Sequence, residues 1–186
     1  MSGLQQLARL DLAFSLLCLQ HRFRQPVTTI SRWVSRTGDG HLYALLLTLV
    51  WWFGDKADAL FSQSGVMAFA IELPLYWLAK NSFKRRRPHE LTPLIRINFQ
   101  PSDKYSLPSG HTAAAFLMAT LIGACYPPFY LLALVFAVLI GLSRILLGVH
   151  FVTDVALGAL LGIGAATLGL QLAGVPVAVA VSGVGG

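Results

Sequence analysis

The sequence predicts an all-α fold, a polytopic membrane bundle of five to six transmembrane helices. Hydrophobic residues make up 55% of the 186 residues, and charged residues only 12%, well below the roughly 25% of an ordinary soluble domain. The apolar residues also form separate runs, divided by polar or proline-containing joins. A spanning helix needs about 20 mostly apolar residues, and several of these runs come close to that length. A bilayer is therefore the predicted surrounding of most of the chain.

Five runs are expected to span the membrane. In chain order they cover residues 42–54, 59–79, 112–126, 129–142 and 151–172. Pro74 lies inside the second run and predicts a kink, whereas the pair Pro127 and Pro128 separates the third run from the fourth.

The first forty residues are less regular. The run Leu10–Leu19 is short, so it either spans with help from its neighbours or lies in the interface. Residues 28–36 place Trp33 opposite Arg32 and Arg36, a pattern typical of a helix lying on the membrane. The expected organisation is one domain over residues 1–186, with N-terminal helices at 1–40, a helical core at 41–173 and a tail at 174–186.

The last run contains a pair of glycines four residues apart, Gly158 and Gly162. Such small-xxx-small pairs let two membrane helices approach closely. The alternative, glycine that is simply tolerated in a membrane helix, is about equally well supported by the sequence.

The net charge of +6 does not indicate nucleic-acid binding. Seven of the fourteen Lys and Arg residues lie between Lys80 and Lys104, and the second half of the chain is almost uncharged. A nucleic-acid surface would need basic residues spread over a soluble face. This distribution favours anionic headgroups or phosphate as partners.

The remaining polar residues gather at the ends of the predicted spans. Lys80 to Pro88 follows the second run, Pro108 to His111 opens the third, Ser143 and Arg144 close the fourth, and His150 with Asp154 opens the fifth. Because successive spans are antiparallel, these four ends lie on one side of the membrane. The sequence therefore predicts one polar site on one face.

The first of these clusters is basic. If the helix continues past Lys80, then Lys84 and Arg87 return to nearly the same face, and Pro88 ends the helix. A basic run of this kind also commonly flanks a span only to bind headgroups, and taken alone the two interpretations are even.

The second cluster, Pro108 to His111, is expected to start a helix. Ser109 is a good N-cap, and Gly110 allows the backbone to come close to a ligand, so the first amides of the helix would form an anion site. By itself this signal is weak.

The third cluster brings an imidazole and a carboxylate together. His150 and Asp154 are four residues apart and share a helical face, so Asp154 can accept a hydrogen bond from one ring nitrogen and leave the other free to attack. A metal site is disfavoured, because only His111 and His150 are well placed and no carboxylate cluster lies beside them. No metal and no other cofactor is expected.

Together the clusters resemble the type-2 phosphatidic acid phosphatase superfamily, to which bacterial acid phosphatases and vanadium haloperoxidases also belong. The pattern of that family is K-x6-R-P, P-S-G-H and S-R-x5-H-x3-D. Every fixed position is present in order: Lys80, Arg87 and Pro88, then Pro108 to His111, then Ser143, Arg144, His150 and Asp154.

The resemblance implies a role for each of these residues. His150 would attack phosphorus and become a phosphohistidine, supported by Asp154, while His111 would act as acid and then base. The phosphoryl oxygens would be bound by the remaining site residues: Lys80, Arg87, Ser109, Gly110 and Arg144.

The resemblance also implies a lipid substrate within the bilayer, of the undecaprenyl diphosphate, phosphatidylglycerophosphate or phosphatidic acid type. A lipid phosphotransferase that uses the same histidine and a non-catalytic scaffold or transporter stay open as alternatives. The expected location is a bacterial inner membrane, with the site on the periplasmic face as in the relatives, although the positive-inside rule alone would place the residue 80–104 loop in the cytoplasm.

Glu72 is an acid in the middle of a predicted span, outside the motifs. Such an acid is expected to face the bundle interior. We favour a structural role, a neutral acid hydrogen-bonded near Pro74, over contact with the substrate.

Overall fold

The computed structural model describes residues 3–19, 24–92 and 103–175, and every element in that part of the chain is helical, as the sequence predicts. In chain order the elements are α1 (Gly3–Leu19), α2 (Arg24–Arg36), α3 (Gly40–Phe53), α4 (Lys56–Phe83), α5 (Pro88–Leu91), α6 (Gly110–Cys125), the 3-10 helix η1 (Pro127–Phe129), α7 (Tyr130–Leu146) and α8 (Val152–Leu172). The tail expected at residues 174–186 lies outside the described residues from residue 176 onward.

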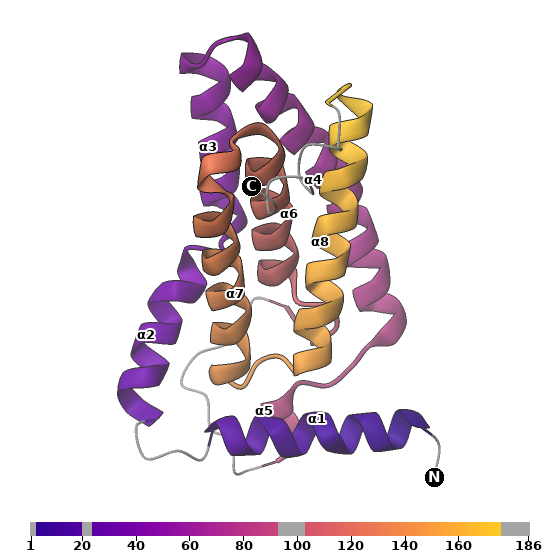
Figure 1. Ribbon diagram of the computed structural model, residues 1–186. Coiled ribbons are helices and arrows are strands. Elements are labelled where there is room, and N and C mark those ends of the chain that lie inside the picture. Colours follow the sequence, from indigo (N-terminus) through magenta and orange to yellow (C-terminus); the bar gives the residue numbers. More distant parts are fainter. Residues whose placement is uncertain (1–2, 20–23, 93–102, 176–186) are drawn as a thin grey trace, which may run out of the picture.

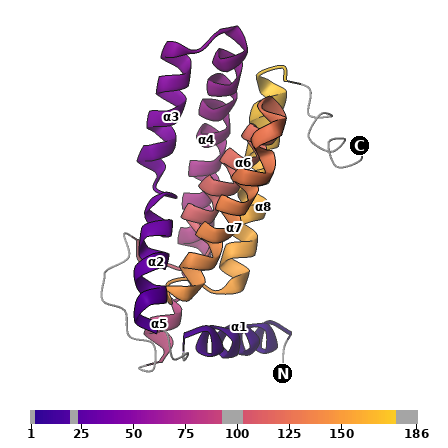
Figure 2. The ribbon, with the colours of Figure 1, turned by 60° about the vertical axis from the view of Figure 1, so that its left-hand side comes forward.

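The long helices α3, α4, α6, α7 and α8 run side by side as an upright bundle, and α1 lies across one end of it (Figure 1). The same crossing is seen after a 60° turn (Figure 2). Helix α6 packs against α3, α4, α7 and α8, so it occupies the centre of the bundle. The run Leu10–Leu19 therefore belongs to a helix that crosses the bundle end, which corresponds to the interfacial alternative.

Helix α2 packs against α7. Its residues Ser31 and Ser35 are buried, whereas Ile30 and Trp33 are exposed. The amphipathic segment predicted at residues 28–36 is thus the second part of α2. It runs obliquely beside the lower half of α7, and does not cross the bundle end as α1 does (Figure 1).

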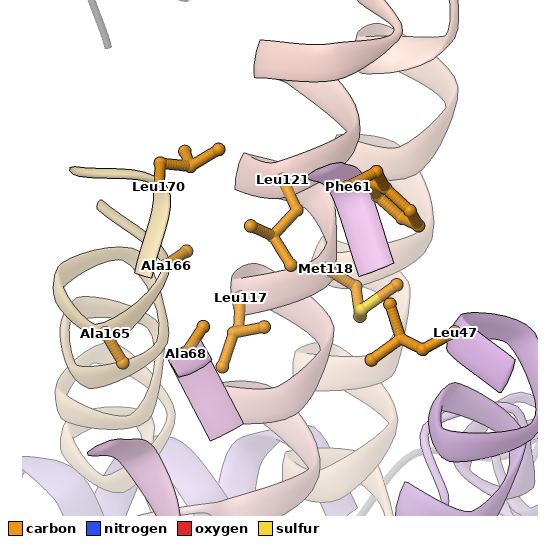
Figure 3. Packing of buried hydrophobic residues seen from close by; sticks show 9 residues of the cluster. All are labelled: Leu47, Phe61, Ala68, Leu117, Met118, Leu121, Ala165, Ala166 and Leu170. Carbon is orange, nitrogen blue, oxygen red and sulfur yellow. The ribbon is translucent and has the colours of Figure 1, made fainter. Parts of the chain in front are cut away.

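The apolar core lies where α3, α4, α6 and α8 meet (Figure 3). Leu117 and Leu121 of α6 are completely buried there, with Phe61 of α4 and Ala166 of α8 against them. A cluster drawn from four helices holds the bundle together, and so fixes the ends of those helices relative to one another.

The glycine pair on α8 is a close-packing site, as one of the two interpretations predicts. A Cβ atom built on Gly162 would lie 2.1 Å from the carbonyl oxygen of Ala113, and one on Gly158 would lie 2.6 Å from that of Ser109. Any side chain at either position would push α8 away from the backbone of α6.

The surface of the bundle fits a bilayer. Residues 127–146 and 152–172 are each long and apolar enough to cross a membrane, whereas α6 is apolar but shorter. Large apolar side chains such as Leu131, Phe136 and Leu160 are exposed, as are the lipid-facing side chains of membrane helices.

Candidate active site

A cavity of about 700 Å³ lies between α3, α4 and α6 and reaches the connection between α7 and α8. Its polar end is lined by Asp103, His111, Arg144 and His150, which come from separate parts of the chain. Toward Trp51 of α3 the lining becomes mostly apolar, and we name this part, between α3 and α4, the apolar groove. One cavity thus joins a charged end to a groove suited to a hydrocarbon chain.

The structure brings the two motif histidines, His111 and His150, to the same cavity. A backbone contact explains this: the N–H of Ser109 donates to the carbonyl oxygen of Asp154 at 3.0 Å. The start of α6 is therefore joined to the first turn of α8, and the closely packed Gly158 on the next turn allows the approach.

Two motif cations share one carboxylate. Lys80 and Arg87 are buried, and each pairs with a different oxygen of Asp103. The Tyr76 hydroxyl donates to the same carboxylate at 2.5 Å and accepts from the Lys80 ammonium at 2.6 Å. Asp103 therefore lies between the two cations and pairs with both.

The charges around Asp103 keep it ionised. Burial by itself would raise the pKa of this carboxyl group, but hydrogen bonds from Lys80 and Tyr76 and the charges of Lys80 and Arg87 outweigh burial. Together they lower the pKa of Asp103 to about 2. The carboxylate is therefore an anion at every ordinary pH.

The predicted helix through Arg87 is wrong. Helix α4 ends at Phe83, and the exposed Lys84 caps it with a left-handed backbone, φ 46° and ψ 37°. A residue in this conformation ends a helix and turns the chain. Pro88 consequently begins the short α5 and does not end α4. Lys80 and Arg87 converge because the chain turns back, and not because they share a helical face.

Arg87 and Arg144 also hold neighbouring segments. Arg87 donates to the carbonyl oxygens of Val149 at 2.9 Å and Tyr105 at 3.1 Å, and so fixes the residue next to His150. Arg144 donates to the hydroxyl of Ser35 in α2 at 2.5 Å. The two arginines therefore position neighbouring segments of the site in addition to giving it positive charge.

His150 is only 2% exposed, and it is one of the residues that line the cavity. Its Nδ1 lies 3.6 Å from a carboxylate oxygen of Asp154, which is longer than the roughly 2.7–3.2 Å of a hydrogen bond. Burial, reinforced by the charges of Arg144, Arg87 and Lys80, lowers the pKa of His150 well below its ordinary value of 6.5. The imidazole is therefore neutral and retains a lone pair.

The carboxylate of Asp154 has partners that the sequence did not indicate. One oxygen accepts from the N–H of Phe151 at 2.8 Å, and the other accepts from Arg85 at 2.7 Å. Arg85 also donates to Thr153 at 2.6 Å and to Asp11 of α1 at 2.8 Å. This network ties α1 to the group behind His150.

His111 is likewise paired outside the motifs. Its Nε2 lies 2.9 Å from a carboxylate oxygen of Asp39, the residue before α3. A carboxylate at this distance can accept the Nε2 proton and so orients the ring. The first forty residues thus reach the imidazole predicted to act as acid and base.

Helix α6 begins where the sequence predicts, but the predicted capping hydrogen bond of Ser109 is absent. Ser109 is the N-cap residue, yet its hydroxyl lies 2.8 Å from that of Thr112 and does not cap a backbone N–H. At Gly110 an added Cβ would lie 2.9 Å from the Tyr76 ring. Glycine is required here because α4 presents an aromatic ring against the turn.

Sequence reasoning missed several polar residues around the predicted site. Five of them contact predicted site residues directly, namely Ser35, Asp39, Tyr76, Arg85 and Asp103, and Asp11 contacts Arg85. A signal existed for Tyr76, which is four residues before Lys80 and shares its helical face. The others approach from distant segments or loops, and spacing carries no information about such contacts. Among the described residues no group of three or more His, Cys, Asp or Glu side chains is arranged to hold a metal ion.

The fold and the site define a class: all-helical membrane proteins with buried cations and imidazoles at one end of a helix bundle. The chain belongs to the PAP2 superfamily, whose family model matches residues 59–175, more than half of the chain. This range includes every motif position from Lys80 to Asp154, so the resemblance seen in the sequence is confirmed.

Two solved structures are similar to this chain over most of its length. The crystal structure of LpxE from Aquifex aeolicus shares 29% identity, covers 87% of this chain and 95% of its own, and superposes with a TM-score of 0.77. A transmembrane PAP2-type phosphatidylglycerolphosphate phosphatase from Bacillus subtilis shares 24% identity over 92% of this chain and 87% of its own, with a TM-score of 0.71, and supports the fold alone.

A curated relative by sequence is a decaprenylphosphoryl-5-phosphoribose phosphatase of Mycobacterium tuberculosis. It is 41% identical over 89 residues, 46% of each chain. The match therefore spans about half the length of that relative.

Proposed function

We propose that the protein is a metal-independent lipid phosphate phosphatase that forms a phosphohistidine on His150. The observation that carries the proposal is a neutral, buried imidazole beside Lys80, Arg87 and Arg144, in a cavity that continues as the apolar groove. The charged end suits a phosphoryl group, and the groove suits the hydrocarbon chain attached to it.

Binding begins with an exchange of anions. The phosphoryl oxygens replace the Asp103 carboxylate on Lys80 and Arg87, and Arg144 contacts them from α7. Charge-assisted contacts of this kind strengthen as charge gathers on the equatorial oxygens, so they lower the barrier as well as bind the substrate.

The first chemical step transfers the phosphoryl group to the protein. Nε2 of His150 attacks phosphorus, because Nδ1 faces Asp154. A nitrogen–phosphorus bond forms while the bond from phosphorus to the leaving oxygen breaks, and His111 donates its proton to that oxygen. Asp154 and the Arg85 network hold the ring and stabilise the positive charge it acquires.

The second step releases phosphate. A water molecule gives its proton to His111 and attacks phosphorus, the nitrogen–phosphorus bond breaks, and the neutral imidazole of His150 returns. His111 thus acts first as acid and then as base, and Asp39 keeps the ring in place through both steps.

The proposal includes a topology. Helices α3, α4, α6, α7 and α8 span a bacterial inner membrane, α1 lies at its surface, and the site opens to the periplasmic side. Single cysteines placed in the residue 89–107 loop should react with an impermeant maleimide in intact cells. Labelling only after lysis would place the site in the cytoplasm.

The test of the activity measures phosphate release from phosphatidic acid, phosphatidylglycerophosphate and undecaprenyl diphosphate by the purified protein. We expect turnover of at least one lipid, inhibition by vanadate, no loss with a chelator, and an acid-labile phosphoprotein absent from His150→Ala. Full activity in His150→Ala would refute the nucleophile, and strong loss with chelator would refute metal independence.

A further inference from the structure

Glu72 is a buried acid that the proposed reaction does not use. Its side chain is 2% exposed, and it belongs to the lining of the apolar groove on α4. No described residue forms a hydrogen bond or ion pair with its carboxyl group, and the neighbouring groove residues Phe69 and Leu73 are apolar. The sequence favoured a structural role in which Glu72 forms a hydrogen bond near Pro74. No described residue forms that hydrogen bond.

The position of Glu72 relates it to the phosphate end. Tyr76 and Lys80 follow it at intervals of four residues, so the three side chains lie on one face of α4. Glu72 is two turns, about 12 Å, beyond Lys80 along the helix axis. Tyr76 lies between them, but its hydroxyl is already engaged by Asp103 and Lys80. Glu72 is therefore the polar group that a bound lipid meets next.

A carboxyl group in an apolar groove is costly unless it has a partner. As a neutral acid it can donate one hydrogen bond. A polyprenyl chain offers no acceptor beyond its phosphates, whereas a glycerolipid carries ester carbonyl oxygens a few bonds from phosphorus. The two substrate classes therefore differ in whether they can satisfy Glu72.

We propose that Glu72 donates a hydrogen bond to an ester carbonyl of the bound lipid, and so selects acyl-ester glycerolipid phosphates over polyprenyl phosphates. This inference rests on the proposed function, because it assumes a lipid phosphate bound at Lys80 and Arg87. It makes Glu72 a specificity residue that contacts the substrate without taking part in the chemistry.

The experiment compares two lipids that differ only in the carbonyl groups. Phosphate release is measured from a diester phosphatidic acid and from its diether analogue of equal chain length, with undecaprenyl diphosphate as the third substrate. We expect kcat/KM of the wild type to favour the ester by about tenfold, the equivalent of one net hydrogen bond.

Two variants of Glu72 and one control variant test whether this residue causes the preference for the ester. Glu72→Gln retains a donor and should keep the ester preference, whereas Glu72→Leu should reduce the ester-to-ether ratio to about one. Ser62 lines the same groove, and its buried hydroxyl also has no described hydrogen-bond partner. Ser62→Ala is therefore the control and should leave the ester-to-ether ratio unchanged.

The outcomes separate this inference from the proposed function. A wild-type ratio near one, a Glu72→Leu ratio equal to that of the wild type, or a preference for undecaprenyl diphosphate overturns the role of Glu72 while leaving the phosphatase intact. Release from none of the three lipids would instead overturn the proposed function. If Glu72→Leu does not fold, the wild-type ratio and Glu72→Gln still decide.

Discussion

The core that the family model matches, residues 59–175, and the segment before it serve the same site in different ways. The core contains the groups predicted to hold and attack phosphorus. The earlier segment contributes Asp11, Ser35 and Asp39, and each touches a core residue: Arg85, Arg144 and His111, respectively.

Distance from phosphorus should therefore set how much a substitution lowers the rate. Groups that contact the reacting atoms act directly on the barrier, whereas a residue that only orients such a group acts through it. Substitutions in the two regions should therefore form a graded series, with the core nucleophile at one extreme and Asp11 at the other.

The largest effect is expected for His150→Ala. Removing a nucleophile abolishes the covalent route, so we expect kcat to fall on the order of 10⁴-fold or more. The measurement is phosphate release together with phosphoenzyme trapping. His41→Ala, which removes an exposed imidazole in the first turn of α3, is the control and should retain activity. Residual phosphoenzyme in His150→Ala would assign the nucleophile elsewhere.

Asp39→Asn should show how strongly the early segment supports His111. The substitution keeps the size of the side chain but removes its charge, and we expect kcat to fall about tenfold with KM little changed. A double-mutant cycle provides the check, because Asp39→Asn should have no further effect when His111 is already alanine. Additive losses would show that Asp39 acts by another route.

Asp103→Asn should weaken the competition between the Asp103 side chain and a bound anion for Lys80 and Arg87. Without the carboxylate the cations are free for an anion, so vanadate should inhibit at about tenfold lower concentration. Because the pKa of Asp103 is about 2, the wild-type carboxylate competes equally at every ordinary assay pH. A vanadate affinity that is unchanged in Asp103→Asn would mean that the carboxylate does not occupy the anion site.

The same carboxylate predicts a pH dependence of stability. Its folded pKa lies below the ordinary aspartate value of 3.8, so its contribution to stability is present above that value and is lost as the pH falls through about 2. The melting temperature in detergent should therefore fall more steeply between pH 4 and pH 2 for the wild type than for Asp103→Asn. Parallel curves for the two proteins would contradict this.

The smallest effect is expected for Asp11→Asn. Asp11 contacts Arg85 and Thr153 but neither Asp154 nor His150 itself, so we expect about a threefold loss in kcat. Arg85→Ala should cost more, because it removes the direct partner of Asp154. A loss for Asp11→Asn as large as that for Arg85→Ala would end the proposed gradation between the two regions.

Much of the fold was predictable because apolar runs report helices directly. The runs at residues 112–126 and 151–172 correspond closely to α6 and α8. The end of α4 was not predictable, because a left-handed Lys84 stops the helix where neither glycine nor proline marks a stop. The count of membrane-spanning helices stays a prediction beyond the two stretches that meet the length and hydropathy requirements.

The helical class, the family and the meeting of four span ends on one side could be read from the order of residues, because helix period, apolar run length and motif spacing are local properties of the chain. The three-dimensional fold was needed to show that Asp103 lies between Lys80 and Arg87, that Asp39 faces His111, and that Glu72 lines the apolar groove. Those arrangements depend on which segments fold back against one another, and such contacts leave no periodic trace in the order of residues.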